Sequence, residues 1–202
     1  AWPALALTEP TNEIKYRFNW TSPAVVSQHD TKVIYHGGNV LFRTADRGKT
    51  WAPISPDLTR NDKATQGWGG APITNEGAGG EVYGAIVAIA ESPHDANTIY
   101  VGTDDGLVQL TRDGGKSWTN VTPAGVPVGL ANEVEVSPHD AGTVYLAFRL
   151  DRHGDYTPYA YKSTDYGKTW TPIVKGLRAG EPVRAVREDP VRRGLLYAGT
   201  ET

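Results

Sequence analysis

The chain has 202 residues, a formal net charge of −3 and a pI near 6.0. This length is enough for a sizeable core, and the weakly acidic balance excludes the basic surface by which proteins bind nucleic acid or anionic membranes. With 23 glycines and 14 prolines, the composition indicates an all-β protein with many turns.

Cysteine is absent, which excludes disulfides, thiolate metal sites and cysteine nucleophiles. No stretch approaches the ~20 apolar residues of a membrane span, and residues 1–10 lack the basic-then-apolar pattern of an export signal. Because methionine is missing even at position 1, we expect the numbering to begin inside a longer gene product or after processing.

A turn that leads into a strand recurs along the chain with constant spacing. It runs from Ser27 to Tyr35, from Ser92 to Tyr100 and from Ser137 to Tyr145, eight residues each time. A looser fourth copy begins at residues 188–190 and reaches Tyr197. Internal repeats of this kind indicate a repetitive architecture.

A second motif, Ser/Thr-x-Asp-x-Gly-x-Thr/Ser-Trp, follows each of the first three turns. Its short polar residue and its Asp can accept hydrogen bonds from backbone N–H groups of a tight turn, and its Gly allows positive φ. The Trp can bury a large apolar area between sheets. We therefore interpret these residues as structural. They are Thr44, Asp46, Gly48 and Trp51; Thr111, Asp113, Gly115 and Trp118; and Ser163, Asp165, Gly167 and Trp170.

Short β-rich runs between the motifs predict four antiparallel strands per repeat, which is the arrangement of a β-propeller blade. The predicted strands are 23–27, 33–36, 40–44 and 50–54 in blade one; 85–91, 98–102, 107–111 and 117–121 in blade two; 132–137, 143–149, 158–163 and 169–174 in blade three; and 183–188 and 195–199 in blade four.

Residues 13–20 are predicted as a further strand, the outer strand of a preceding blade. The whole chain, 1–202, then forms a partial propeller: blade one about 23–55, blade two about 85–122, blade three about 132–175 and the start of a fourth at 183–202. An open arc exposes strand edges, so we expect the remainder of the propeller or another chain to complete the ring. A small four-bladed ring closed by 13–20 is the alternative.

The three motifs resemble the Asp boxes of the bacterial neuraminidase repeat, which occurs in sialidases, xyloglucanases and sortilin-type receptors. Segments 16–23, 54–62, 101–108 and 194–202 resemble large exported bacterial proteins described as sortilin-like or as "glycosyl hydrolase" repeat proteins. The resemblance implies that this chain is a fragment of a secreted, periplasmic or cell-surface protein. Sialidase activity is not expected, because the Phe/Tyr-Arg-Ile-Pro motif of sialidases is absent.

Propellers bind ligands mostly on the rim opposite the Asp boxes, and three segments are expected there. Residues 56–84 form a long connection with Trp68, Glu76, Glu81 and Tyr83, and long loops are often functional. Residues 150–157, expected as a loop, supply Asp151, Arg152, His153, Asp155 and Tyr156. Residues 103–106 form a tight turn with Asp104, which we expect to be only a hairpin turn.

Trp68, Tyr83, Asp151, Arg152, His153 and Tyr156 are the candidate binding residues, and Glu76, Glu81, Asp104 and Asp155 are weak catalytic candidates. Structural interpretations compete with each: Trp68 can instead be a buried plug, and Tyr83 can pack at the start of blade two.

No metal site and no cofactor are predicted. His29, His94 and His139 occupy the same turn of three different blades, so they cannot converge on an ion, and we expect them to cap their turns. Calcium at Asp151 and Asp155 lacks the dense Asp spacing of a calcium loop.

Two functions stay open. The first is a non-catalytic scaffold or binding module outside the cytoplasm, for a protein or glycan partner. The second is a glycoside hydrolase module similar to xyloglucan-cleaving tandem propellers, which needs two opposed carboxylates.

Overall fold

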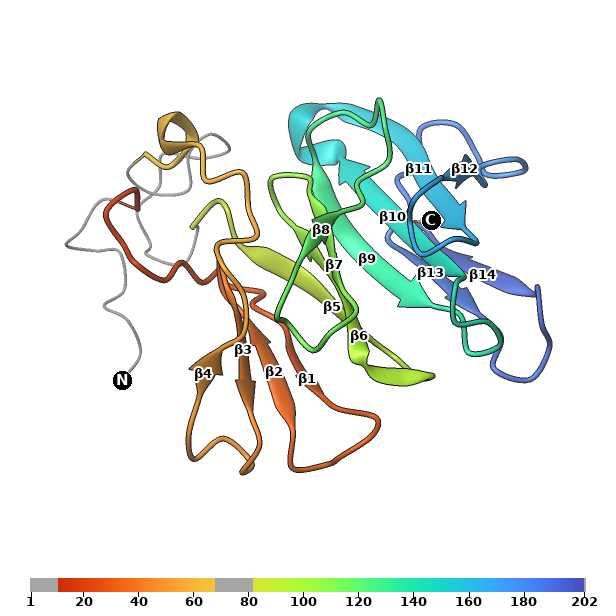
Figure 1. Ribbon diagram of the computed structural model, residues 1–202. Coiled ribbons are helices and arrows are strands. Elements are labelled where there is room, and N and C mark those ends of the chain that lie inside the picture. The colour runs from red at the N-terminus through yellow and green to blue at the C-terminus, as the bar shows by residue number, and fades with distance from the viewer. Residues whose placement is uncertain (1–10, 68–81, 202) are drawn as a thin grey trace.

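The computed structural model describes residues 11–67 and 82–201, which form four antiparallel sheets side by side in chain order (Figure 1). Three sheets have four strands each, paired in sequence order, and the last has two. The predicted all-β fold of successive propeller blades is confirmed.

Every strand expected in the four blades is present. Blade one has β1 Ala24–Val26, β2 Ile34–Gly37, β3 Leu41–Thr44 and β4 Ala52–Pro53. Blade two has β5 Ile86–Ser92, β6 Asp95–Thr103, β7 Val108–Thr111 and β8 Thr119–Asn120. Blade three has β9 Leu130–Val136, β10 Val144–Leu150, β11 Asp155–Ser163 and β12 Thr171–Pro172, and blade four has β13 Ala185–Glu188 and β14 Leu196–Gly199. Two short 3-10 helices are η1 Lys63–Thr65 and η2 Asp151–His153.

Residues 13–20 form no strand, so this expectation was wrong. Their aromatic side chains pack on the face of blade one instead of pairing by backbone: Phe18 stacks on His36 and on Phe42, with ring centroids 5.2 and 5.7 Å apart, and Tyr16 meets Phe42 edge-on. The segment pairs with no strand of blade four, so it does not close a small ring.

Residues 150–157, expected as a loop, are mostly regular structure. β10 runs through Leu150, η2 makes the turn, and β11 begins at Asp155, which pairs with Leu150. The two strands therefore continue almost to the tip of the hairpin and hold its side chains in place.

The Asp boxes are hydrogen-bonded as their chemistry predicts. In the first box, the Thr44 hydroxyl donates to Asp46 (2.7 Å) and accepts from the Gly48 N–H (3.0 Å), while Asp46 accepts the N–H of Thr50 (2.9 Å). The boxes at Asp113 and Asp165 repeat these bonds. The glycines at their centres have φ between 82° and 98°, which favours glycine.

Each Asp-box turn lies beside the first turn of its own blade. The backbone N–H of Arg47 donates to Lys32, that of Gly114 to Asn97 and that of Tyr166 to Gly142. Both turns thus lie on one rim, here called the Asp-box rim, as expected. The opposite rim, which carries the β2–β3, β6–β7 and β10–β11 turns, is called the loop rim.

The apolar core lies between the blades. Tyr35 and Leu41 of blade one pack with Ile99 and Val101 of blade two. The next two interfaces repeat this pattern, around Phe148 between blades two and three and around Ala147 and Val186 between blades three and four. Each internal sheet therefore buries both faces.

Histidines bridge neighbouring blades, so capping is only half of their role. The backbone N–H of each donates to its own turn serine, as expected. The side chains reach further: Nε2 of His29 lies 2.8 Å from the Ser92 carbonyl, His94 bonds Ser137 and His139 bonds Asp189 in the same way. An acceptor carbonyl requires that Nε2 be the donor.

The Asp-box tryptophans form a second set of bridges. Trp118 Nε1 donates to the Ile54 carbonyl of blade one (3.2 Å), and Trp170 Nε1 donates to Val121 of blade two (2.7 Å). Trp51 donates to Gly48 in its own box and is 43% exposed. The predicted burial of these tryptophans between sheets therefore holds for the second and third boxes and not for the first.

A buried glutamate joins blades one and two. Glu91 accepts the hydroxyls of Ser27 (2.8 Å) and Tyr35 (3.0 Å). Val136 replaces it in blade three, and the hydroxyl of Tyr100, the counterpart of Tyr35, is buried without a hydrogen-bond partner among the described residues.

We expect Tyr35→Phe to lower the free energy of unfolding by about 2 kcal/mol, because Glu91 would lose a buried donor. The matched change Tyr100→Phe removes only an unpaired hydroxyl and should leave stability unchanged or raise it. Urea unfolding of both variants measures the difference, and equal losses would contradict this account.

Acid should weaken the Asp boxes. Hydrogen bonds, first those from Thr50 and its equivalents, hold the pKa of Asp46, Asp113 and Asp165 at about 2, below the usual 3.8. A depressed pKa means that the ionised form stabilises the fold; this contribution is complete above pH 3.8 and disappears as pH falls through 2. Thermal unfolding followed by circular dichroism should show a steeper fall in Tm over this range for the wild type than for Asp113→Asn.

Candidate functional site

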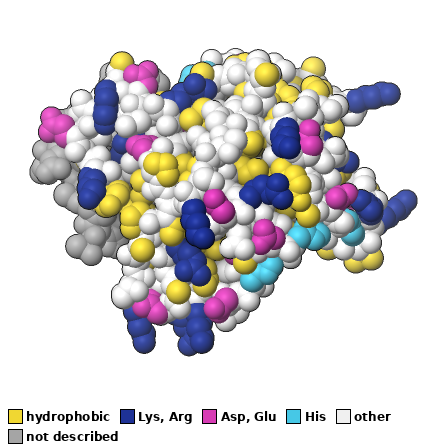
Figure 2. Space-filling model, viewed as in Figure 1, with side chains coloured by type: hydrophobic (Ala, Val, Ile, Leu, Met, Phe, Trp, Pro, Cys, Tyr) yellow, Lys and Arg dark blue, Asp and Glu magenta, His cyan; other side chains and the backbone are white. Residues whose placement is uncertain are grey.

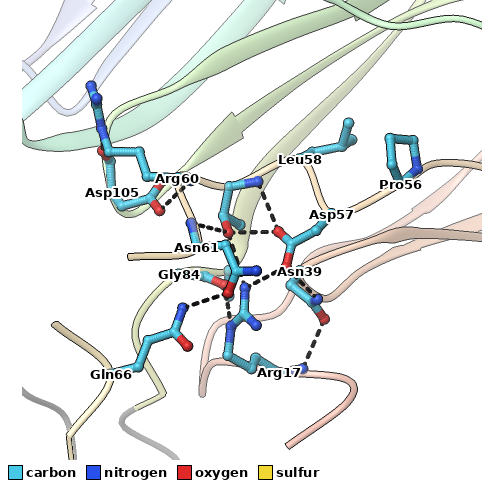
Figure 3. A network of polar contacts seen from close by, with 12 residues as sticks. Arg17, Asn39, Pro56, Asp57, Leu58, Arg60, Asn61, Gln66, Gly84 and Asp105 are labelled. Atoms are coloured by element: carbon cyan, nitrogen blue, oxygen red, sulfur yellow. Dashed lines mark hydrogen bonds and ion pairs between the residues drawn. The ribbon is translucent and has the colours of Figure 1, made fainter. Parts of the chain in front are cut away.

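The loop rim is held by a buried polar network centred on Arg17 (Figure 3). The Arg17 side chain is 2% exposed, and its Nη2 contacts Asp57 Oδ2 at 2.8 Å and Thr59 Oγ1 at 3.0 Å. Its Nε donates to the Gly84 carbonyl at 3.0 Å. Since an unpaired buried charge is very costly, these partners fix Arg17 and connect three distant segments of the chain.

Asp57 is the anion of this network. Its Oδ1 accepts the N–H (3.0 Å) and hydroxyl (2.6 Å) of Thr59, a local turn typical of Asp-x-Thr. Oδ2 accepts from Asn39 at 2.9 Å as well as from Arg17. Burial alone would raise the pKa of Asp57, but the hydrogen bonds from Thr59, Asn39 and Arg17 lower it. Asp57 is therefore an ionised structural group.

Asp104 and Asp105 form a hairpin turn, as predicted, and they also anchor the loops around it. Asp104 Oδ1 accepts the backbone N–H groups of Gly84 (2.9 Å) and Ala85 (2.8 Å). Asp105 accepts the Thr103 hydroxyl (2.6 Å) and the Arg60 N–H (2.8 Å). Burial raises the pKa of Asp104 to about 7 and raises that of Asp105.

The other candidates in residues 56–84 are placed as follows. Tyr83 is buried at the start of blade two, and burial with the nearby Asp105 and Asp104 raises its pKa to about 12. A surface ligand would not reach its ring. Trp68, Glu76 and Glu81 lie outside the described residues.

The β10–β11 hairpin brings its candidates to the tip. Asp151 forms a two-point ion pair with the buried Arg149, at 3.1 and 2.7 Å. Asp155 accepts the Thr157 N–H (2.9 Å) and the Tyr159 hydroxyl (2.8 Å), and these bonds lower its pKa. Asp155 is thus suited to be an ionised turn residue rather than a proton donor.

Arg152 and His153 are exposed at the same tip, and Tyr156 is 52% exposed. Trp20, 69% exposed, also belongs to the loop rim, because its neighbour Asn19 donates to Val82 and to Asp104. The sequence predicts a strand through Trp20 and gives no sign of a place on the loop rim, because the position of Trp20 depends on the long-range contacts of Asn19.

Ion pairs also join the first strands of blades three and four, β9 and β13. Arg187 on β13 pairs with Glu133 and Glu135 on β9. Burial raises the pKa of both glutamates, and Arg187 opposes this. The alternating Glu133 and Glu135 are the sequence signal that one face of β9 is polar.

Within residues 11–67 and 82–201, no group of three or more His, Asp or Glu side chains is arranged to hold a metal ion. The same part of the chain contains no helix that is long and apolar enough to cross a membrane.

Comparison with known proteins supports the fold. The BNR/Asp-box repeat family matches residues 161–172, the third Asp box. An ancestral GH74 enzyme is 21% identical over 91% of this chain and 23% of its own, with a TM-score of 0.58. The GH74 xyloglucanase from Xanthomonas campestris is 19% identical over 80% and 24%, with a TM-score of 0.54.

A chain of the COPII outer coat vertex on membranes is 13% identical over 92% of this chain and 43% of its own, with a TM-score of 0.52. No curated protein sequence matches the chain. It spans about a quarter of the length of the two GH74 enzymes. At such identities the likeness shows the fold alone.

Arg17→Ala should lower the free energy of unfolding by about 3–5 kcal/mol, because Asp57 would remain partly buried without its cation. The control is Arg178→Ala, whose ion pair with Glu181 involves a side chain that is 79% exposed and should contribute below about 1 kcal/mol. Denaturant titration of the two variants measures both losses; a small loss for Arg17→Ala would show that the network is dispensable.

Proposed function

We propose that this run of Asp-box propeller blades is a non-catalytic binding module that holds a protein or glycan partner on its loop rim. The observation that carries the proposal is the exposure of two aromatic side chains on that rim, since Trp20 and Tyr156 expose 69% and 52% of their surfaces. The candidate carboxylates Asp104 and Asp155 accept hydrogen bonds from the chain itself.

Exposed aromatic rings suit binding to sugars or proteins. A tryptophan or tyrosine offers a large rigid surface at low entropic cost and dominates many interfaces. Around Tyr156, Arg152 and His153 supply exposed polar groups that can orient a partner. The loop rim therefore offers apolar contact surface together with hydrogen-bond donors.

The partner need not be a polyanion. Figure 2 shows positive and negative side chains interspersed over the face in view, and the chain as a whole carries a net charge of −3. A nucleic acid or a strongly anionic surface would need a concentrated basic patch. Neutral glycans and proteins fit this surface better.

The alternative is a glycoside hydrolase module, favoured by one observation: the pKa of Asp104, raised by burial to about 7, suits a general acid. Against it, Asp104 already accepts two backbone N–H groups, and Asp155 has a lowered pKa. A hydrolase also needs a second carboxyl group across the substrate. We therefore rank it second.

We also propose that the protein works outside the cytoplasm. The support is the resemblance of its repeats to exported bacterial propeller proteins.

The binding proposal can be tested on an array of neutral and acidic oligosaccharides and on a displayed peptide library. We expect the wild type to bind one class, and Trp20→Ala or Tyr156→Ala to weaken binding about tenfold, the loss expected when one aromatic contact of about 1.4 kcal/mol is removed. Trp51→Ala, on the Asp-box rim, is the matched aromatic control. Equal loss in the control, or no binding to either library, would contradict the proposal.

Hydrolysis of xyloglucan and β-glucan oligosaccharides should be undetectable in the same preparations. Turnover that disappears in Asp104→Asn would favour the hydrolase instead.

A further inference from the structure

Trp20 stands in a tight turn that Asn19 ties to the start of blade two. The Asn19 carbonyl accepts the N–H (3.0 Å) and the hydroxyl (2.7 Å) of Ser22, so residues 19–22 form a β-turn with Trp20 inside it. The Asn19 amide nitrogen donates to the Val82 carbonyl (3.2 Å) and to Asp104 Oδ2 (3.3 Å). The position of Trp20 on the loop rim therefore depends on these contacts of Asn19.

Asp104 accepts hydrogen bonds on both oxygens of its carboxyl group. Oδ1 accepts the backbone N–H groups of Gly84 (2.9 Å) and Ala85 (2.8 Å), and Oδ2 accepts only the longer bond from Asn19. Asp104 is 5% exposed, and Asp105 beside it is 3% exposed. Two buried carboxyl groups at adjacent positions oppose each other's ionisation.

The cations near this turn are engaged elsewhere. Arg60 donates its Nε to the Asp105 carbonyl and its backbone N–H to the Asp105 carboxylate (Figure 3). Arg17 pairs with Asp57. In the part of the chain that the structure describes, no Lys, Arg or His side chain lies within ion-pair distance of Asp104. Asp104 is therefore a buried acid without a direct counter-ion.

The other segments around the turn add no positive charge. Residues 128–129, which pack against Gly106 of this turn, bring only Val and Gly. The remaining titratable neighbours are acids, Asp62 and Tyr83. Burial, the largest cause, and the adjacent Asp105 raise the pKa of Asp104 to about 7, although the N–H groups of Ala85, Gly84 and Asn19 act in the opposite direction.

A proton on Asp104 would disturb the contact with Asn19 first. Oδ1 accepts two short N–H bonds and is kept as an acceptor, so the proton goes to Oδ2. A protonated Oδ2 is a donor that faces the amide N–H of Asn19, and two donors form no hydrogen bond.

We propose that Asp104 is a positioning residue for Trp20 and that a single proton on its carboxyl group controls this role. When Asp104 is ionised, Asn19 is held and Trp20 projects from the rim as in the structure. When Asp104 is protonated, Asn19 is released and the turn shifts away from blade two. The consequence for binding rests on the proposed function: a partner that contacts Trp20 should bind up to about tenfold more weakly at about pH 6 than at about pH 8.

Fluorine NMR of the chain labelled with 5-fluorotryptophan tests the positioning role without a partner. The chain has six tryptophans, and the signal that Trp20→Phe lacks is that of Trp20. We expect this signal to shift in one step with a midpoint near pH 7. The signal of Trp118, which bridges blades one and two, should show no such step.

Variants identify the group that takes the proton. Asp104→Asn keeps an oxygen for Gly84 and Ala85 but places an amide N–H opposite Asn19, so the Trp20 signal should keep its low-pH position at every pH. Asn19→Ala should remove the step from the other side of the contact, and circular dichroism checks that each variant is folded. Histidine also changes charge near neutral pH. Since His36 stacks on Phe18, His36→Gln is the matched control and should leave the step in place.

A constant Trp20 signal in the folded wild type, a step that persists in Asp104→Asn, or a step that His36→Gln removes would overturn the proposal. Once the libraries have identified a partner, its affinity should fall from about pH 8 to about pH 6 in the wild type and stay low at both in Asp104→Asn. Equal wild-type affinities would overturn control of binding by Asp104. A step of the expected kind without any partner would support the positioning role and contradict only the proposed function.

Discussion

A single four-stranded sheet has two faces, and this protein buries both only by stacking sheet on sheet. Tyr35, Leu41, Ile99 and Val101 form one such contact, and the two later interfaces repeat it. Backbone pairing stops at the border of each blade, so side chains must align neighbouring sheets. Histidine and tryptophan do this with directed hydrogen bonds to backbone carbonyls, and they make the position of one blade depend on that of the previous one.

The loop rim depends on this alignment. Arg17 reaches Asp57 and Thr59 after β4 and Gly84 before β5, so it connects the entry segment to the connection between two blades. Asp105, in the β6–β7 turn of blade two, accepts the backbone N–H of Arg60 in the connection that follows β4. The exposed rings of Trp20 and Tyr156 therefore project from a rim whose backbone is fixed by buried charges. If the proposed partner binds there, this rigidity would lower the entropy lost on binding.

Local chemistry made much of this predictable. The Asp boxes could be read directly, because each bond joins residues at most four positions apart. The strands followed from β-rich runs between two regular landmarks. The Arg17–Asp57 pair spans 40 residues and leaves no periodic signal. Residues 13–20 were misread because an aromatic-rich run suits a strand and equally suits packing on a neighbouring sheet, and only the tertiary contacts of Phe18 decide between them.

The residue before each turn motif alternates along the chain: Val26, Glu91, Val136, Glu188. Interfaces that place a glutamate opposite the tyrosine therefore alternate with interfaces that place a valine there. Loss of blade two alone would bring Tyr35 opposite Val136 and leave the Tyr35 hydroxyl without a partner. Joint loss of blades two and three would instead bring Tyr35 opposite Glu188. Repeat arrays of this type should therefore gain or lose blades more readily in pairs than one at a time. The Tyr100 hydroxyl, which has no hydrogen-bond partner among the described residues, identifies the interface of the valine kind.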